Sequence, residues 1–217
     1  MLRSLSSPPT SRGICFAHAA LVAAFVLTSL ALSGCKRQIM PTNTIPLDNV
    51  GMNYTAVATL KSLDITNPEV AELVKVKQAG LSDDSCVSLI RLARSRKEQF
   101  HNGDDIAELV KAGIPEPTIL DLAQINSLSA WGGEAVAMHL AGLSDQIILE
   151  DIRRTSAGQP VLSGASLADF KNAGMRESTL LQLVRMGVPD SEANRILNFR
   201  RHGWSDAAIL RHYIGGK

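Results

Sequence analysis

The sequence has few aromatic residues and almost no excess of charge. Phe, Trp and Tyr make up 4% of its 217 residues, and 22 basic residues stand against 21 acidic ones, for a formal net charge of +1. A chain without a strong positive charge is not expected to bind nucleic acid. Because aromatic residues are scarce, a core must be built mainly from aliphatic side chains and alanine. The length is enough for one domain with a substantial core or for two small ones.

The signatures of catalytic and metal sites are also missing. No Gly-rich phosphate loop, GxSxG elbow or catalytic-cysteine motif occurs in the sequence. The four histidines beyond residue 100 do not stand at the spacings typical of a metal site; they are His101, His139, His202 and His212. We therefore predict no catalytic residue, no metal and no cofactor, and we leave the identity of any ligand open.

An apolar segment near the N-terminus leads into a cysteine. Arg3 and Arg12 precede the run ICFAHAALVAAFVLTSLAL (14–32), and the tetrapeptide LSGC then ends at Cys35. A basic start, an apolar stretch and small residues before a cleavage point are the layout of a secretory signal. An uncleaved transmembrane anchor is the alternative, because about nineteen residues nearly reach the ~20 that span a bilayer. His18 and the many alanines weaken such a span.

The ending LSGC resembles the lipobox of bacterial lipoproteins. The resemblance implies cleavage before Cys35, attachment of diacylglycerol to its thiol and acylation of its new amino group. Such acyl chains hold a protein on a membrane surface without a spanning helix. Lys36 and Arg37 follow the cysteine and no aspartate does, which resembles the signal for outer-membrane delivery in two-membrane bacteria. The expected location is therefore the bacterial cell envelope, at the outer membrane and facing the periplasm.

These features divide the chain into three parts. We assign residues 1–34 to a signal peptide, residues 35–53 to the lipidated cysteine and a flexible tether, and residues 54–217 to a helical domain. The tether is expected because Pro41 and Pro46 stand among turn-forming residues in a segment without helical periodicity.

The helical domain repeats with a period of about 61 residues. The pentapeptide AGLSD at 79–83 returns unchanged at 141–145, and HGWSD stands at 202–206. A second pair of markers, AGIPEP and AGMRES, places Gly113 and Gly174 about the same distance apart. Two independent markers with one period indicate a tandem duplication, present roughly two and two-thirds times.

Apolar residues recur at helical spacing through this domain, and no segment alternates like a strand. We predict an all-α fold of tandem helix–turn–helix repeats, with four helices in each unit, forming a compact or solenoid-like domain. The expected helices are 54–63, 68–79, 83–94, 104–112, 116–125, 130–141, 145–155, 166–173, 176–186, 191–202 and 206–213.

The repeated pentapeptide has the composition of a turn between two helices. Gly80, Gly142 and Gly203 are expected to adopt the left-handed conformation that ends a helix, with the following Leu or Trp packed on its last turn. The serine of the motif would cap the next helix, and the aspartate would lie at its positive end. Ligand binding by these corners is the alternative, and we favour the structural role.

Two further features allow both a structural and a functional interpretation. Cys86 aligns with Ile148 and Ile209, so we predict a buried, unreactive core residue rather than a nucleophile. The segments RLARSRK (91–97) and DIRRTS (151–156) are basic ends of equivalent helices, which the helix dipole favours. A phosphate or lipid-headgroup site is the alternative for these basic ends.

The corners, roughly LxxAG-apolar-S/P-D/E, resemble short helical repeats of uncharacterised bacterial lipoproteins and envelope proteins. The resemblance covers most of residues 57–213 and implies no activity. We expect a lipid-anchored, non-catalytic protein that presents a surface to an unknown envelope protein. One alternative is an envelope enzyme or enzyme subunit whose site is assembled in a groove. Another is a binder of cell-wall glycan, which the low aromatic content disfavours because sugar faces usually stack on aromatic rings.

Overall fold

The computed structural model describes residues 42–126 and 128–215. Cys35, the signal peptide and the first part of the predicted tether lie outside the described residues. The described part consists of α-helices and one short 3-10 helix without any strand, so the all-α prediction is confirmed. In chain order the helices are α2 (Ile45–Asn49), α3 (Tyr54–Ser62), α4 (Asn67–Ala79), α5 (Asp83–Ser95), α6 (Gly103–Lys111), α7 (Glu116–Ile125), α8 (Leu128–Leu140), α9 (Asp145–Ser156), α10 (Gly164–Asn172), α11 (Glu177–Met186), η1 (Asp190–Glu192), α12 (Ala193–Arg201) and α13 (Asp206–Ile214).

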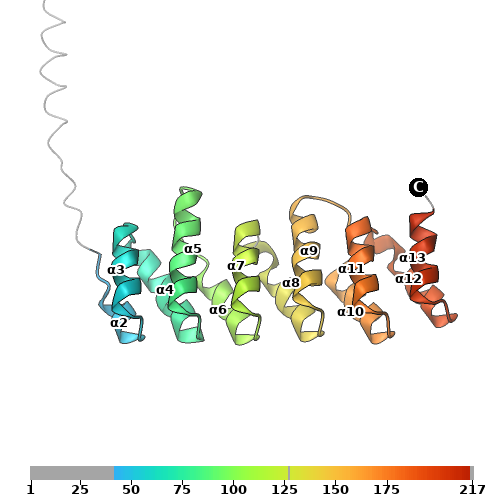
Figure 1. Ribbon diagram of the computed structural model, residues 1–217, viewed down its shortest axis with the longest axis horizontal. Helices are drawn as coiled ribbons and strands as arrows, with labels where there is room; N and C mark the ends of the chain where they lie inside the picture. The colour runs from blue at the N-terminus through green and yellow to red at the C-terminus, as the bar shows by residue number, and fades with distance from the viewer. Residues whose placement is uncertain (1–41, 127, 216–217) are drawn as a thin grey trace, which may run out of the picture. The chain divides into compact units, whose positions relative to one another are not determined.

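Consecutive helices pair into hairpins that follow one another in a row (Figure 1). We number them hairpin 1 (α2 and α3) to hairpin 6 (α12 and α13). Each helix packs against its partner and against the helix two places further along the chain, such as α4 against α6 and α5 against α7. The even-numbered helices therefore form a first layer and the odd-numbered helices a second layer. This arrangement within residues 42–215 is that of a solenoid, in which each repeat packs on its neighbours.

The structural repeat is the two-helix hairpin, and the 61-residue period of the sequence contains two of them. The second-layer helices α5 and α9 have 13 and 12 residues, whereas α3, α7, α11 and α13 have 9 or 10. Short and long second-layer helices therefore alternate from hairpin 1 to hairpin 5. Each hairpin turns at a glycine with positive φ; these are Gly51, Gly80, Gly113, Gly142, Gly174 and Gly203.

The corner between α4 and α5 shows how the AGLSD sequence makes this turn. Gly80 has a φ of 112° and ends α4, and the N–H of Leu81 donates to the carbonyl of Val76 at 3.3 Å. Leu81 is fully buried, and the hydroxyl of Ser82 accepts from the N–H of Ser85 at the start of α5. The predicted left-handed glycine, the buried apolar residue and the serine cap are all present here.

The predicted tether is wrong for residues 42–53, which belong to hairpin 1. Pro46 lies in the first turn of α2, where its missing N–H costs no helical hydrogen bond. Leu47 is fully buried and Met52 nearly so, at the positions that Val76 and Leu81 occupy in hairpin 2. The helix is only five residues long, which is too short for a helical period to show in the sequence.

Buried apolar side chains from all six hairpins form one continuous core. Across residues 42–126 and 128–215, no helix is both long enough and apolar enough to cross a membrane.

Candidate functional site

The acidic residues that begin α5, α7 and α13 each link two successive hairpins. The N–H of Asn53 donates to the carboxylate of Asp83 at 2.9 Å, and the N–H of Ser82 donates to that of Glu116 at 3.0 Å. Asp206 accepts in the same way from the N–H of Arg176 at 3.0 Å. Each carboxylate thus lies at the positive end of its own helix and satisfies a backbone donor of the preceding corner. We call this series the carboxylate ladder.

A lysine, arginine or histidine six positions earlier lies close to four of the five acidic residues that begin second-layer helices. Lys77 lies 2.6 Å from Asp83, and the same spacing joins Lys171 to Glu177, Arg200 to Asp206 and, at 3.8 Å, His139 to Asp145. Burial alone would raise the pKa of Asp83, but its bonds to Lys77 and Asn53 outweigh burial and lower it. The aspartates of the AGLSD corners therefore have structural partners.

The corner of hairpin 4 departs from the predicted serine cap. Ser144 has the backbone conformation of an N-cap, but its hydroxyl accepts no hydrogen bond from α9. It instead bonds to the carboxylate of Glu177 in the next hairpin, where it helps to lower the pKa of that group after Lys171. The ladder is also interrupted between hairpins 3 and 4, because Pro115 stands at the corner and has no N–H to give to Asp145.

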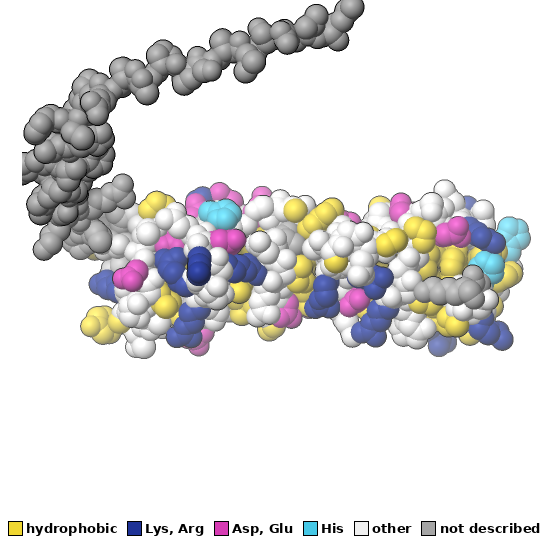
Figure 2. Space-filling model, turned by 90° about the horizontal axis from the view of Figure 1, so that it is seen from above, with side chains coloured by type: hydrophobic (Ala, Val, Ile, Leu, Met, Phe, Trp, Pro, Cys, Tyr) yellow, Lys and Arg dark blue, Asp and Glu magenta, His cyan; other side chains and the backbone are white. Residues whose placement is uncertain are grey.

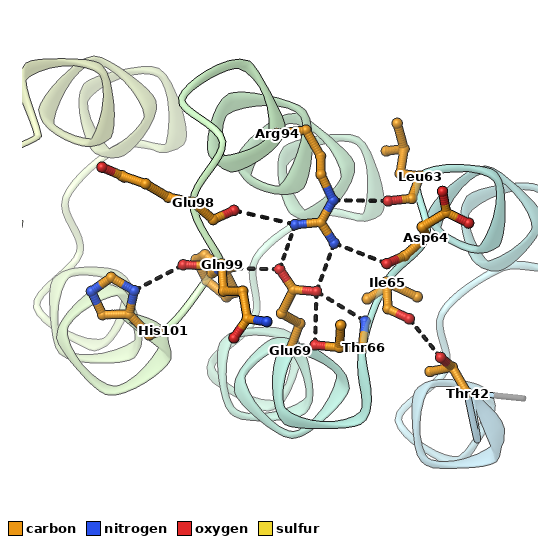
Figure 3. Close-up of polar contacts among 11 residues, drawn as sticks. Thr42, Leu63, Asp64, Ile65, Thr66, Glu69, Arg94, Glu98, Gln99 and His101 are labelled. Atoms are coloured by element: carbon orange, nitrogen blue, oxygen red, sulfur yellow. Dashed lines mark hydrogen bonds and ion pairs between the residues drawn. The ribbon is translucent and has the colours of Figure 1, made fainter. Parts of the chain in front are cut away.

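The basic ends of α5 and α9 cap neighbouring helices, and Figure 3 shows the contacts of Arg94 in α5. Arg94 donates to the last carbonyls of hairpin 1, at 2.9 Å from the oxygen of Leu63 and 3.1 Å from that of Asp64. It also holds the fully buried carboxylate of Glu69 at 2.7 Å. Burial alone would raise the pKa of Glu69, but the bonds from Arg94 and from two backbone N–H groups lower it to about 2.

Other arginines at these helix ends act similarly. Arg96 donates to the carbonyls of Ala123 and Gln124 at the end of α7, and Arg154 donates to that of Arg185 at the end of α11. These contacts occupy the guanidinium groups of Arg94, Arg96 and Arg154, three of the basic residues considered for a phosphate or headgroup site. Their role is to satisfy helix carbonyls that have no partner within their own helix.

Cys86 is fully buried and forms no disulfide, and burial raises the pKa of its thiol to about 12. A thiol that stays protonated is a poor nucleophile, so the predicted core role is supported. His101 and His202 are exposed, and each ring bonds to a backbone carbonyl within its own segment. Among the described residues no group of three or more acidic, His or Cys side chains is arranged to hold a metal ion.

The open end of hairpin 6 carries a cluster of aromatic rings that sequence analysis missed. The rings of Phe199 and Trp204 are stacked with centroids 4.3 Å apart, and His212 meets both edge-on. Tyr213 extends the cluster, at 5.2 Å from His212. We call these four residues the aromatic end cluster. In a chain with 4% aromatic residues, three aromatic side chains and a histidine thus gather on one hairpin.

Trp204 and Phe199 stand at positions that are buried in every preceding hairpin. The residue after the corner glycine is Trp204 in hairpin 6 and is 39% exposed, whereas its counterparts are at most 5% exposed; they are Met52, Leu81, Ile114, Leu143 and Met175. The counterparts of Phe199 are likewise buried; they are Leu47, Val76, Leu109, Met138 and Phe170. Each of those hairpins is followed by another, and no described hairpin follows hairpin 6. The aromatic end cluster therefore lies on a stacking face that no hairpin covers within residues 42–126 and 128–215.

Charged and apolar groups surround the cluster. The guanidinium of Arg195 lies 5.5 Å from the centre of the Phe199 ring, and Arg201 and Arg211 are exposed nearby on α12 and α13. The α13 end of Figure 2 shows hydrophobic, histidine and Lys or Arg side chains together on the surface. An apolar groove of about 320 Å³ lies beside it, between the end of α11 and the exposed Ile214. Trp, Tyr and Arg are the residues most enriched in the energetic centres of protein interfaces.

A second group that sequence analysis missed is Asp151 in α9. Its side chain is 1% exposed, and its Oδ1 atom has no hydrogen-bond partner in the described part of the chain. Burial and the nearby carboxylates of Glu134 and Asp190 raise its pKa to about 7, against the opposing charge of Arg154. An alignment of the hairpins on their corner glycines would have shown that Asp151 is unusual. The same position holds a leucine in four other hairpins: Leu60, Leu89, Leu122 and Leu183.

Comparison with protein-family models gives no match to this chain. Comparison with curated proteins likewise finds no relative. The function must therefore be argued from the surfaces and groups described above.

Proposed function

We propose that this chain is a lipid-anchored, non-catalytic helical-repeat protein of the bacterial cell envelope that binds another protein through the end of hairpin 6. The observation that carries the proposal is the aromatic end cluster. Trp204 is 39% exposed at a position that the other hairpins bury almost completely. Large apolar side chains clustered on a surface mark interaction sites more often than scattered ones do.

The rest of the helical unit supports a binding role. Its conspicuous polar groups are used in joining hairpins, as the carboxylate ladder and the Glu69–Arg94 pair illustrate. A solenoid built in this way is a rigid carrier for a surface, because each repeat is fixed by its neighbours. Rigid aromatic anchors flanked by arginines favour protein binding, since little side-chain entropy is lost when they are covered.

The proposed anchor rests on the sequence LSGC that ends at Cys35. Acylation of Cys35 would place hairpin 1 near the membrane through the short segment that precedes Thr42. The partner would then be a protein of the envelope, at the outer membrane and facing the periplasm. The anchor is tested by the intact mass of detergent-extracted protein, which should correspond to residues 35–217 plus acyl chains. An unmodified chain beginning at Met1 would refute it.

A second candidate function is binding of cell-wall glycan, and Trp204 is the observation that favours it. Sugar rings stack on exposed aromatic faces, but one face of the Trp204 ring is already covered by Phe199 at 4.3 Å. The arginines around the cluster also suit a protein or an acidic group better than a neutral sugar. We therefore place protein binding first.

Site-specific photocross-linking in living cells tests the binding proposal. A photoreactive amino acid is placed at position 204 and, as matched controls, at Tyr54 and Leu140, which are 85% and 72% exposed on other hairpins. We expect a discrete protein adduct from position 204 and none of the same mass from the two controls. Adducts with glycan alone, or equal adducts from all three positions, would contradict the proposal.

A further inference from the structure

The contacts between successive described hairpins show what kind of surface would pack on the end of hairpin 6. At each of the five junctions, the second-layer helix of the next hairpin begins with Asp or Glu. At three of them this carboxylate accepts from the corner N–H of the hairpin before it. In hairpins 1 to 5, the residue after the corner glycine belongs to the continuous apolar core. Hairpin 6 has the same corner and the same residue position after its glycine, but no described hairpin follows it.

We propose that the end of hairpin 6 accepts a helix of a partner protein that begins with Asp or Glu, stacked as a seventh hairpin would be. This inference rests on the proposed function and specifies the chemistry of the partner. The carboxylate of the partner helix would accept from the backbone N–H of Ser205. Its apolar face would cover the aromatic end cluster, as a continuation of the stacking interface inside the chain.

The donor for the incoming carboxylate is already in position. Ser205 has φ and ψ of −72° and 155°, close to the −66° and 157° of Ser82, whose N–H donates to Glu116. The N–H of Ser205 has no partner among the described residues, whereas the N–H groups at the equivalent Asn53, Ser82 and Arg176 each have a carboxylate. At the two other corners, Pro115 has no N–H, and Ser144 meets the carboxylate of Glu177 through its hydroxyl instead. The corner conformation is therefore preformed for the same bond.

The charge around this face also suits an acidic partner. Within the described part of the chain, Arg201 is exposed and has no ion pair, and Arg211 bonds to a backbone carbonyl of its own helix. Arg195 pairs with Glu192 at 3.4 Å and lies over the ring of Phe199. Positive groups around an apolar centre favour a partner of opposite charge and raise its association rate.

Hairpin 1 of a second copy does not meet this requirement. Its second-layer helix, α3, begins with Tyr54, where the helices of the later hairpins begin with Asp or Glu. Tyr54 is 85% exposed and offers no carboxylate to Ser205. Head-to-tail stacking of two copies would therefore leave the corner donor unsatisfied, and a different chain is the occupant that fits.

The experiment supplies a hairpin of the stated chemistry to the full chain. A second copy of residues 188–214 is joined after Gly216. This joint keeps the natural spacing, because Gly216 follows Asp206 by ten residues, as Gly187 follows Glu177 by ten residues before residue 188. The extended chain carries Trp131→Phe, and the added copy carries Trp204→Leu, so that the original Trp204 is the single fluorescent reporter. We expect acrylamide to quench Trp204 several-fold less than in the unextended Trp131→Phe chain.

Two variants test the role of the carboxylate. Asp206→Asn in the added copy removes the acceptor charge, and we expect quenching to return most of the way to the value of the unextended chain. Ser205→Pro in the original hairpin removes the donor N–H. Proline is compatible with this corner, because Pro115 occupies the equivalent position of hairpin 3 with φ and ψ of −60° and 143°. It is expected to restore quenching as well.

Each result supports or overturns the inference. An added hairpin that leaves Trp204 fully quenchable would show that the aromatic end cluster closes the solenoid by itself. Equal protection with and without Asp206→Asn would refute the requirement for an acid. Protection of the unextended chain by soluble cell-wall fragments would favour the glycan instead. If position 204 cross-links to a protein in cells but the added hairpin does not protect Trp204, this inference is wrong and the proposed function stands. If the added hairpin protects Trp204 but position 204 forms no cross-links in cells, the proposed function is wrong.

Discussion

At the scale of single residues, buried charges in this solenoid differ in how well they are satisfied. Glu69 is surrounded by donors, whereas Asp151 occupies a leucine position and keeps an oxygen without a partner. A buried carboxylate without donors is destabilising when ionised, and a fully bonded one is tolerated. The two residues therefore make opposite contributions to the dependence of stability on pH.

Asp151→Leu is expected to stabilise the protein, because leucine fills this position in four other hairpins. The folded pKa of Asp151 is raised from 3.8 to about 7, so its contribution to stability is complete below about pH 4 and is lost as the pH rises through 7. The gain from Asp151→Leu should therefore be larger at about pH 8 than at about pH 5, reaching roughly 1–4 kcal/mol in urea unfolding. The control, Asp121→Leu on the exposed surface of α7, should not stabilise the protein in this way. A loss of stability in Asp151→Leu at both pH values would contradict this account.

Arg94→Ala is expected to destabilise the protein by about 3 kcal/mol, because it leaves the carboxylate of Glu69 buried without its cation. Glu69 has a folded pKa lowered from 4.5 to about 2, so its contribution is present above about pH 4.5 and is lost as the pH falls towards 2. Arg94→Ala should weaken this acid-side loss, as measured by thermal unfolding between about pH 2 and pH 6. Arg91→Ala, on the exposed side of the same helix, should change stability by less than about 0.5 kcal/mol.

Some residue roles were predictable from sequence and others were not. Cys86 was predicted to be buried because its repeat counterparts are isoleucines, and that pattern is local. The unusual position of Asp151 was missed because an alignment at the 61-residue period compares it only with Leu89 and His212. An alignment of every hairpin, at about half that period, is needed to show that most hairpins have leucine at this position. Ser144 was assigned to its own helix, but its partner lies in the next hairpin, which no local pattern encodes.

At the scale of helices, glycines set both the turns and the spacing between hairpins. The corner glycines need positive φ, and Gly103 and Gly164 at the starts of α6 and α10 instead allow close approach to the preceding first-layer helix. The corners were predictable because the sequence of a turn is contiguous. Helix α2 was not, because a five-residue helix is held mainly by packing against its neighbours.

Two glycine substitutions separate close packing from helix propensity. A Cβ atom at Gly103 would lie 2.6 Å from the backbone oxygen of Glu72, so Gly103→Ala should cost about 1–3 kcal/mol of unfolding free energy. Gly133 lies inside α8 with no atom within 4 Å of the added Cβ, so Gly133→Ala should stabilise by about 0.5–1 kcal/mol. Chemical denaturation of both variants measures the difference; equal effects of the same sign would mean that the packing of α4 on α6 has been misjudged.

At the scale of the whole helical unit, the row of hairpins has two different ends. Hairpin 1 begins without an acidic residue to extend the carboxylate ladder, and hairpin 6 ends with an unused corner donor and a partly exposed aromatic face. The sequence allowed both a compact bundle and a solenoid, because the repeat pattern alone does not state which helices touch. The exposed end could not be predicted, since the exposure of a side chain depends on whether another hairpin packs over it rather than on its residue type.

The most direct measurement of the central claim is the exposure of Trp204 in the cell. Hydroxyl-radical footprinting is applied to intact cells and to the purified protein, and oxidation of Trp204 is compared with that of Tyr54, which is 85% exposed on hairpin 1. The account predicts strong protection of Trp204 in cells, its oxidation in the purified protein, and similar oxidation of Tyr54 in both. Equal oxidation of Trp204 in cells and in purified protein would show that nothing covers the end of hairpin 6, and would contradict the account.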